Sequence, residues 1–155
     1  MLTQTSEYAL RALCALAARP GETIPAADLA TQAGVPNPYL AKIMQALSAA
    51  EFVEGRRGIG GGYALAFDPA KVTVLEVVLA LGPIRTPRTA AEIDKLADGF
   101  ADLHRCLDLA AQSVLDRLHR TTIADIAQNL DALAASKGPI AVRSTTNGRH
   151  QSVAG

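Results

Sequence analysis

The clearest pattern of hydrophobic and polar positions lies in residues 24–65, where two short apolar repeats with helical spacing flank a turn. The first repeat predicts a helix that starts near Pro25, because the first helical position needs no amide donor. Ala30 would let two helices approach closely, and Gly34 supplies the positive φ angle that a sharp corner demands. The pattern therefore predicts a helix-turn-helix.

The second helix of this unit has its own start signal and two different faces. Asn37 is predicted to cap it, and Pro38 to occupy its first position. Apolar residues at helical spacing predict a buried face made of Leu40, Ile43, Met44 and Leu47. The opposite face carries Tyr39, Lys42, Gln45 and Ala49. These side chains suit the DNA major groove, where they would bind phosphates and base edges, although an ordinary solvated face is the alternative.

A glycine-rich hairpin is predicted directly after this helix. One strand begins at Phe52, the returning strand covers residues 63–65, and residues 54–62 between them read E-G-R-R-G-I-G-G-G. Glycines allow tight turns and close approach to a polyanion, and adjacent arginines favour phosphates or a narrow minor groove. The predicted DNA contacts of the hairpin are Arg56, Arg57, Gly60 and Gly61.

The glycines have two other possible roles, in a nucleotide-binding loop or in a purely structural turn. A dinucleotide-binding loop does not fit, because Tyr63 stands where G-x-G-x-x-G, counted from Gly58, needs its third glycine. No G-K-[S/T] sequence follows either, which argues against a phosphate-binding loop of a nucleotide enzyme. A purely structural glycine turn stays open.

Beyond the hairpin, a heptad-like stripe of apolar residues extends along a predicted helix from residue 89 to residue 120. Steps of three and four follow this stripe through the predicted dimerisation residues Ile93, Leu96, Phe100, Leu103 and Leu107 and, by way of Ala110, to Val114. So long an amphipathic helix needs a cover, and a second copy of the chain is the predicted one. Packing against its own domain is the alternative, and Gly99 is the expected point of a kink or division.

Shorter helices are predicted around these elements. Residues 5–18 form the first, with Cys14 beside its apolar face as a small buried hydrophobe. Residues 73–81 form another, and Thr121 or Thr122 caps a last one. Residues 137–155 contain no acidic residue and are rich in Ser, Thr, Gly and Arg, which predicts a disordered tail.

Composition narrows the class of protein. The 155-residue chain has 15 Lys and Arg against 15 Asp and Glu, so its net charge argues against non-specific coating of nucleic acid. A site-specific binder with local positive charge remains compatible. No membrane span or secretory signal is visible, and two distant cysteines argue against a disulfide framework, so a cytoplasmic location is expected.

Several motifs occur together in one family of regulators. The helix-turn-helix, residues 39–40 and 52–53, and the R-G-x-x-G-G-Y sequence at 57–63 resemble the Rrf-two family of bacterial winged-helix transcription regulators. Residues 7–13 and 121–126 resemble that family too. The resemblance implies a mainly α fold: a winged helix-turn-helix DNA-binding domain with a small β-hairpin wing, plus a long C-terminal dimerisation helix. It implies a homodimeric DNA-binding regulator, expected to be a repressor, on an inverted-repeat operator.

The expected domain limits and function follow. Residues 1–83 would form the DNA-binding domain, 84–136 the dimerisation and closing helices, and 137–155 the tail. The histidines and cysteines form no catalytic motif, so no enzyme activity is predicted. The alternative function is a winged-helix protein–protein adaptor that does not bind DNA.

The resemblance also raises the question of an iron–sulfur cluster, which relatives hold with three cysteines between the wing domain and the long helix. Residues 83–100 contain no cysteine here, and a cluster needs about four mostly thiolate ligands. No metal or cofactor is therefore predicted, and an unusual set of Cys106, His104 and Glu7 across a dimer is the alternative. Cys106 flanks the stripe as a candidate redox sensor or an inert thiol, and the expected signal is redox or a small molecule.

Overall fold

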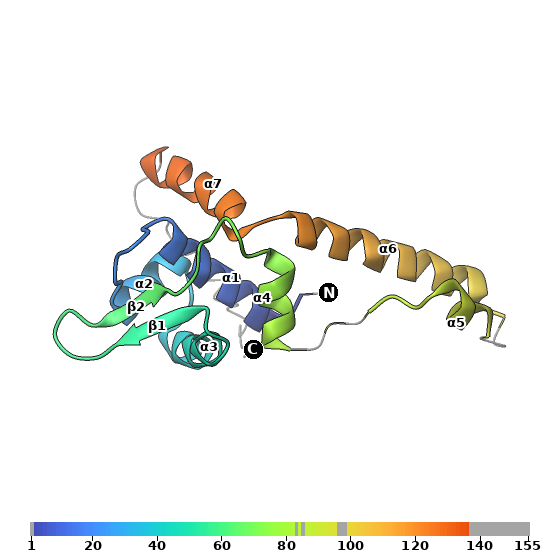
Figure 1. The fold of residues 1–155 in the computed structure, drawn as a ribbon, viewed down its shortest axis with the longest axis horizontal. Coiled ribbons are helices and arrows are strands. Elements are labelled where there is room, and N and C mark those ends of the chain that lie inside the picture. The colour runs from blue at the N-terminus through green and yellow to red at the C-terminus, as the bar shows by residue number, and fades with distance from the viewer. Residues whose placement is uncertain (1, 83, 85, 96–98, 137–155) are drawn as a thin grey trace, which may run out of the picture.

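The computed structural model describes residues 2–82, 84, 86–95 and 99–136 (Figure 1). Its elements, in chain order, are α1 (Gln4–Ala17), α2 (Ala26–Ala33), α3 (Asn37–Ala49), β1 (Val53–Arg56), β2 (Gly62–Leu65), α4 (Val74–Leu81), α5 (Ala90–Asp94), α6 (Ala101–Arg120) and α7 (Ile123–Ser136). This mainly helical fold with one hairpin confirms the predicted fold class. Within the described ranges, no helix has the length and apolar character needed to cross a membrane.

Helix α1 lies at the centre of the domain and packs against α2, α3, α4, α7 and β2. It begins where the Thr3 hydroxyl accepts a hydrogen bond from the Ser6 amide, which satisfies one free donor of the first turn. Its inner face is fully buried at Ala12 and Leu13. Cys14 is 2% exposed, as predicted for a small core residue, and burial raises the pKa of its thiol to about 11.

Helices α2 and α3 form the predicted helix-turn-helix. Gly34 has φ +63° directly after α2, and the Val35 amide then donates to the carbonyl of Ala30, which closes the corner. The predicted cap of α3 is wrong by one residue. Pro36 precedes the helix in an extended conformation and its carbonyl already accepts from the helix, so Asn37 is the first helical residue.

Strands β1 and β2 pair antiparallel, with Val53 opposite Leu65 and Gly55 opposite Tyr63. The hairpin is also tied to the chain just before α2. The Ile24 amide donates to the Tyr63 carbonyl at 2.8 Å, and the Tyr63 amide donates to the Ile24 carbonyl at 2.9 Å. A Cβ at Gly62 would overlap the Ile24 carbonyl, so only glycine fits beside this contact.

Helix α4 and helix α7 start beside each other. Thr73 and Glu76 cap α4 reciprocally, and hydrogen bonds from Thr73 lower the pKa of the Glu76 carboxyl. Thr122 and Asp125 make the same exchange at α7, which confirms the predicted threonine cap. Helix α7 then packs on α1, and its first residue, Ile123, is fully buried.

The single helix predicted for residues 89–120 is wrong. Thr89 and Glu92 cap the short α5, which ends at Asp94, and α6 begins only at Ala101. Gly99, with φ +72°, lies within this break, so the helix is divided in the region of the glycine where a division was expected. Helix α5 contacts α6, and Ile93 is 3% exposed inside the protomer rather than on an outer stripe. Leu96 and the predicted tail at 137–155 lie outside the described residues, and the domain limits at 83 and 136 stay a prediction.

The contact between Gly62 and Ile24 can be tested by substituting the glycine. Gly62→Ala should lower the free energy of unfolding by about 2–3 kcal/mol, because the new methyl group clashes with backbone and separates the hairpin from α2. Gly55→Ala is the control, since a Cβ there meets only the Tyr63 ring at an ordinary 3.6 Å. Urea unfolding measures both, and equal stabilities of the two variants would contradict this role of Gly62.

Candidate nucleic-acid interface

Helix α3 and the hairpin lie next to each other on one side of the molecule (Figure 1). The predicted inner face of α3 is buried, at most 3% exposed, at Leu40, Ile43, Met44 and Leu47. Because these four side chains anchor the helix in the core, its other face is presented to solvent. The exposed residues there include Tyr39, Lys42, Gln45 and Ala49, as the periodicity predicts.

Tyr39 is supported by residues of α1 that the sequence analysis did not assign to this face. The Tyr8 ring meets it edge to face, with centroids 6.1 Å apart. The Arg11 guanidinium lies 5.9 Å from the Tyr8 ring centroid, and Glu7 holds it through a 2.6 Å ion pair. The Gln4 amide donates to the Tyr8 hydroxyl. In the sequence, the only sign of this arrangement is the spacing of Glu7 and Arg11, which lie one helical turn apart and can form an ion pair.

The hairpin presents its two arginines as predicted. Arg56 ends β1, Arg57 begins the loop, and both are exposed. Gly60 is exposed as well, while Gly61 has a structural reason to be glycine. Its amide donates to the Gly58 carbonyl, and a Cβ there would overlap the Arg56 carbonyl. Contact between any of these residues and DNA stays a prediction.

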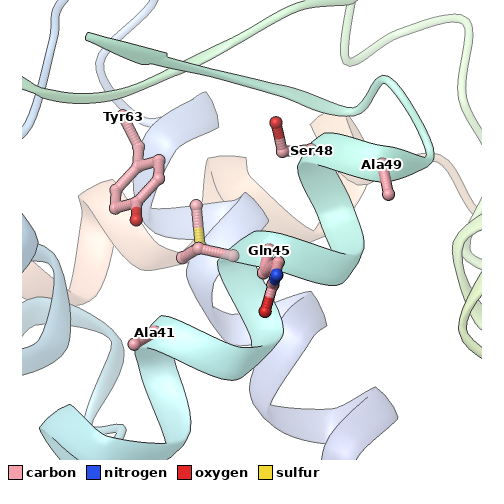
Figure 2. Close-up of a pocket in the computed structure, with 6 residues that line it drawn as sticks. Ala41, Gln45, Ser48, Ala49 and Tyr63 are labelled. Atoms are coloured by element: carbon pink, nitrogen blue, oxygen red, sulfur yellow. The ribbon is translucent and has the colours of Figure 1, made fainter. Parts of the chain in front are cut away.

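A groove of about 340 Å³ separates α3 from the hairpin (Figure 2). Its lining residues are Ala41, Met44, Gln45, Ser48, Ala49 and Tyr63. Gln45 and Ala49 belong to the predicted binding face, whereas Ala41, Ser48 and Tyr63 were not predicted to lie there. Small side chains on α3 leave this space open beside the hairpin.

The α6 region contains the other predicted site residues. Phe100, directly before α6, is 60% exposed, and on α6 itself Leu103, Leu107 and Val114 are 53%, 47% and 43% exposed. Cys106 is exposed on the same helix. Its neighbour Arg105 pairs with Asp102 at 2.8 Å and with Asp94 at 3.5 Å, which links α6 to α5.

Comparison with known proteins identifies relatives of this architecture. A family model described as "Rrf2: Iron-dependent Transcriptional regulator" matches residues 2–129. An HTH-type transcriptional regulator of Mycobacterium tuberculosis is 32% identical over 132 residues, covering 81% of this chain and 80% of that protein. The HTH-type regulator BadM of Rhodopseudomonas palustris is 28% identical over 130 residues, covering 84% of this chain and 83% of BadM.

Solved structures share the fold. CymR, the global cysteine regulator of B. subtilis, superposes with a TM-score of 0.70 at 24% identity, covering 83% of this chain and 97% of CymR. IscR of T. potens superposes with a TM-score of 0.68 at 21% identity, covering 89% of this chain and 93% of IscR. Both likenesses establish the winged helix-turn-helix fold predicted from the sequence.

The family description names iron, and the donor atoms of this chain decide whether it fits here. Of its two cysteines, Cys14 is buried in the core and Cys106 lies on α6. In the ranges that the structure describes, no three His, Cys, Asp or Glu side chains are grouped to hold a metal ion. His104 Nδ1 instead lies 3.1 Å from Arg88 Nη1. These donors do not fit a thiolate-bound cluster.

The family match covers most of the chain, and the similar curated proteins carry the names of transcriptional regulators rather than enzymes. The helix-turn-helix, the glycine-rich wing and the long α6 occur here in the order that the family resemblance implied. The chain therefore belongs to the Rrf2 family of transcriptional regulators.

Proposed function

We propose that this regulator binds double-stranded DNA as a homodimer and represses transcription from an inverted-repeat operator. The observation that carries the proposal is the placement of two different surfaces on one side of the protomer. Helix α3 offers Tyr39, Lys42 and Gln45 to a major groove, with Asn37 and Pro38 at its entry. The wing offers Arg56 and Arg57 to phosphates or the adjacent minor groove.

The exposed apolar residues of α6 support the homodimer. Successive residues turn by about 100° along a helix, so Leu103, Leu107 and Val114 fall within one narrow sector. The 20-residue helix is about 30 Å long, and a second α6 could cover that sector along much of its length. A two-fold dimer would read two inverted half-sites, about one helical turn or a multiple of it apart.

Repression needs only occupancy of an operator that overlaps a promoter, and the proposed surfaces supply occupancy. A winged-helix adaptor is the second candidate, because the fold alone does not dictate a nucleic-acid partner. An adaptor, however, would have no need to expose two wing arginines beside the polar face of α3. The DNA-binding experiment below separates the two functions.

Arg57→Ala should weaken binding to every duplex tested and reduce its salt dependence. Each lost phosphate contact should lower the slope of log affinity against log salt by about 0.9. Gln45→Ala should instead act mainly on base preference. Fluorescence anisotropy on the fragment upstream of the protein's own coding sequence, at a series of salt concentrations, measures both.

The matched control is Lys71→Ala, which removes a positive charge from the segment before α4, on the side away from α3 (Figure 1). Its affinity and salt slope should equal those of the parent protein. If Arg57→Ala behaved like this control, the wing would not contact phosphate. A parent protein that bound no DNA even at low salt would favour the adaptor.

Leu107→Glu should convert the dimer to a monomer, because it places a charge within the apolar sector of α6. Loss of the second half-site contact should lower operator affinity by about a hundredfold or more. Leu109→Glu is the control, because Leu109 is 65% exposed on the same helix but faces away from the sector. This variant should remain dimeric. Sedimentation velocity at micromolar concentration decides, and a parent protein that is monomeric there would refute the dimer.

Cys106 is proposed as the redox-sensing thiol. Native protein at pH 8 should react quickly with a thiol reagent at Cys106 and hardly at Cys14, whose pKa of about 11 leaves roughly one thiolate in a thousand. Peroxide should change DNA affinity in the parent protein and not in Cys106→Ser. If the parent protein and Cys106→Ser respond equally, Cys106 is not the sensor. A brown, iron-containing protein with an unreactive Cys106 would show instead that this thiol is a cluster ligand.

A further inference from the structure

The groove between α3 and the wing could contact DNA in a way that the two wing arginines do not. We infer that it seats one sugar–phosphate strand of the duplex, with the Tyr63 and Ser48 hydroxyls donating hydrogen bonds to phosphate oxygens. The inference rests on the proposed DNA binding and adds two uncharged contacts to it. Four features of the groove lead to it.

The first feature is position. A single backbone strand separates a major groove from the adjacent minor groove. If α3 lies in one and the wing tip in the other, that strand must pass between α3 and the hairpin. A groove of about 340 Å³ lies there, and the side chains of Ala41 and Ala49 are too small to fill it (Figure 2).

The second feature is the way Tyr63 is held. Both of its backbone groups bond to Ile24, which fixes this point of β2 relative to α2. Its cross-strand partner is Gly55, and the ring passes beside this residue, 3.6 Å from where a Cβ of Gly55 would stand. Figure 2 shows the ring extending from β2 toward α3, with its hydroxyl at the end nearer the helix. The Tyr63 hydroxyl is therefore held in position by a rigid ring on a fixed backbone.

The third feature is that both hydroxyls are available. Hydroxyl groups in α2 and α6, and at the end of α6, donate to the carbonyl four residues earlier, at Thr31, Ser113 and Thr121. Ser48 is exposed in α3 and makes no such bond, and in the described part of the chain the Tyr63 hydroxyl has no hydrogen-bond partner either. Figure 2 shows the Ser48 oxygen directed toward the hairpin.

The fourth feature is charge. Residues opposite each other in an antiparallel pair share one face of the ribbon, and adjacent residues alternate faces. Tyr63 and Gly55 therefore share a face, while Glu54 and Arg56 belong to the other one. The lining of the groove is uncharged. It offers neutral donors to a phosphate strand, with cationic side chains nearby at Lys42 on α3 and Arg57 at the loop.

Removing either hydroxyl should weaken DNA binding without changing its salt dependence. Tyr63→Phe and Ser48→Ala should each lower affinity about tenfold, because each loses a hydrogen bond to a charged acceptor. The salt slope should equal that of the parent protein, since neither variant loses a cation. The factor should be similar for the upstream fragment and for a mixed-sequence duplex at low salt, because phosphates carry no sequence information.

The control is Thr121→Val, which removes a hydroxyl at the end of α6, far from α3 (Figure 1), and should leave affinity unchanged. Thermal unfolding of each variant should match the parent protein, so that lost binding reflects a lost contact. A second measurement replaces single phosphates of the duplex by neutral methylphosphonates. The replacement that weakens the parent protein at the Tyr63 contact should have little further effect on Tyr63→Phe.

Three outcomes would overturn the inference. If both variants bind like Thr121→Val, the groove does not hold the strand. If affinity is lost only on the upstream fragment, the hydroxyls read bases instead of phosphates. If the parent protein binds neither duplex, the proposed function itself fails, and that result is distinct from a failure of the groove alone.

Discussion

The pairing of Ile24 with Tyr63 is the constraint on which the candidate DNA-binding face depends. Two backbone hydrogen bonds join β2 to the segment before α2, and Gly62 is glycine because that approach leaves no room for a side chain. A two-stranded hairpin alone is marginally stable. The pairing with Ile24 adds a third segment to the hairpin and fixes the wing relative to α2. The helix-turn-helix corner in turn fixes α2 relative to α3. The width of the groove between α3 and the wing follows from these two connections.

Most elements of the fold could be predicted because their signals are local. The turn at Gly34, the cap at Thr122 and the hairpin each depend on a few adjacent residues. The predicted long helix was wrong because its continuity and its packing partner depend on tertiary contacts. The three-and-four spacing continues through Gly99, but spacing alone cannot tell whether Ile93 faces a second chain or its own protomer. In the structure α5 ends at Asp94, α6 begins at Ala101 after the left-handed Gly99, and Ile93 is buried within the protomer.

The candidate site shows the same limit. Helical periodicity correctly placed Tyr39, Lys42 and Gln45 on the solvent side of α3. It could not indicate Tyr8, which meets Tyr39 only because α1 packs against α3. Nor could it indicate Tyr63, which reaches α3 through the strand register and the bridge to Ile24. The tyrosine of the R-G-x-x-G-G-Y sequence was visible, but its place in a groove is a tertiary property.

The position of α6 gives a physical reason why chemistry far from α3 could control DNA binding. In a dimer built on α6, the angle between the two copies of this helix sets the distance between the two α3 helices. Helix α6 also contacts α4, which packs on the central α1. A modification at Cys106, beside the apolar sector, could therefore change half-site spacing while every DNA-contacting side chain stays intact. In the proposed dimer both half-sites are bound at once, so a small change in that angle would be amplified into a large change in occupancy.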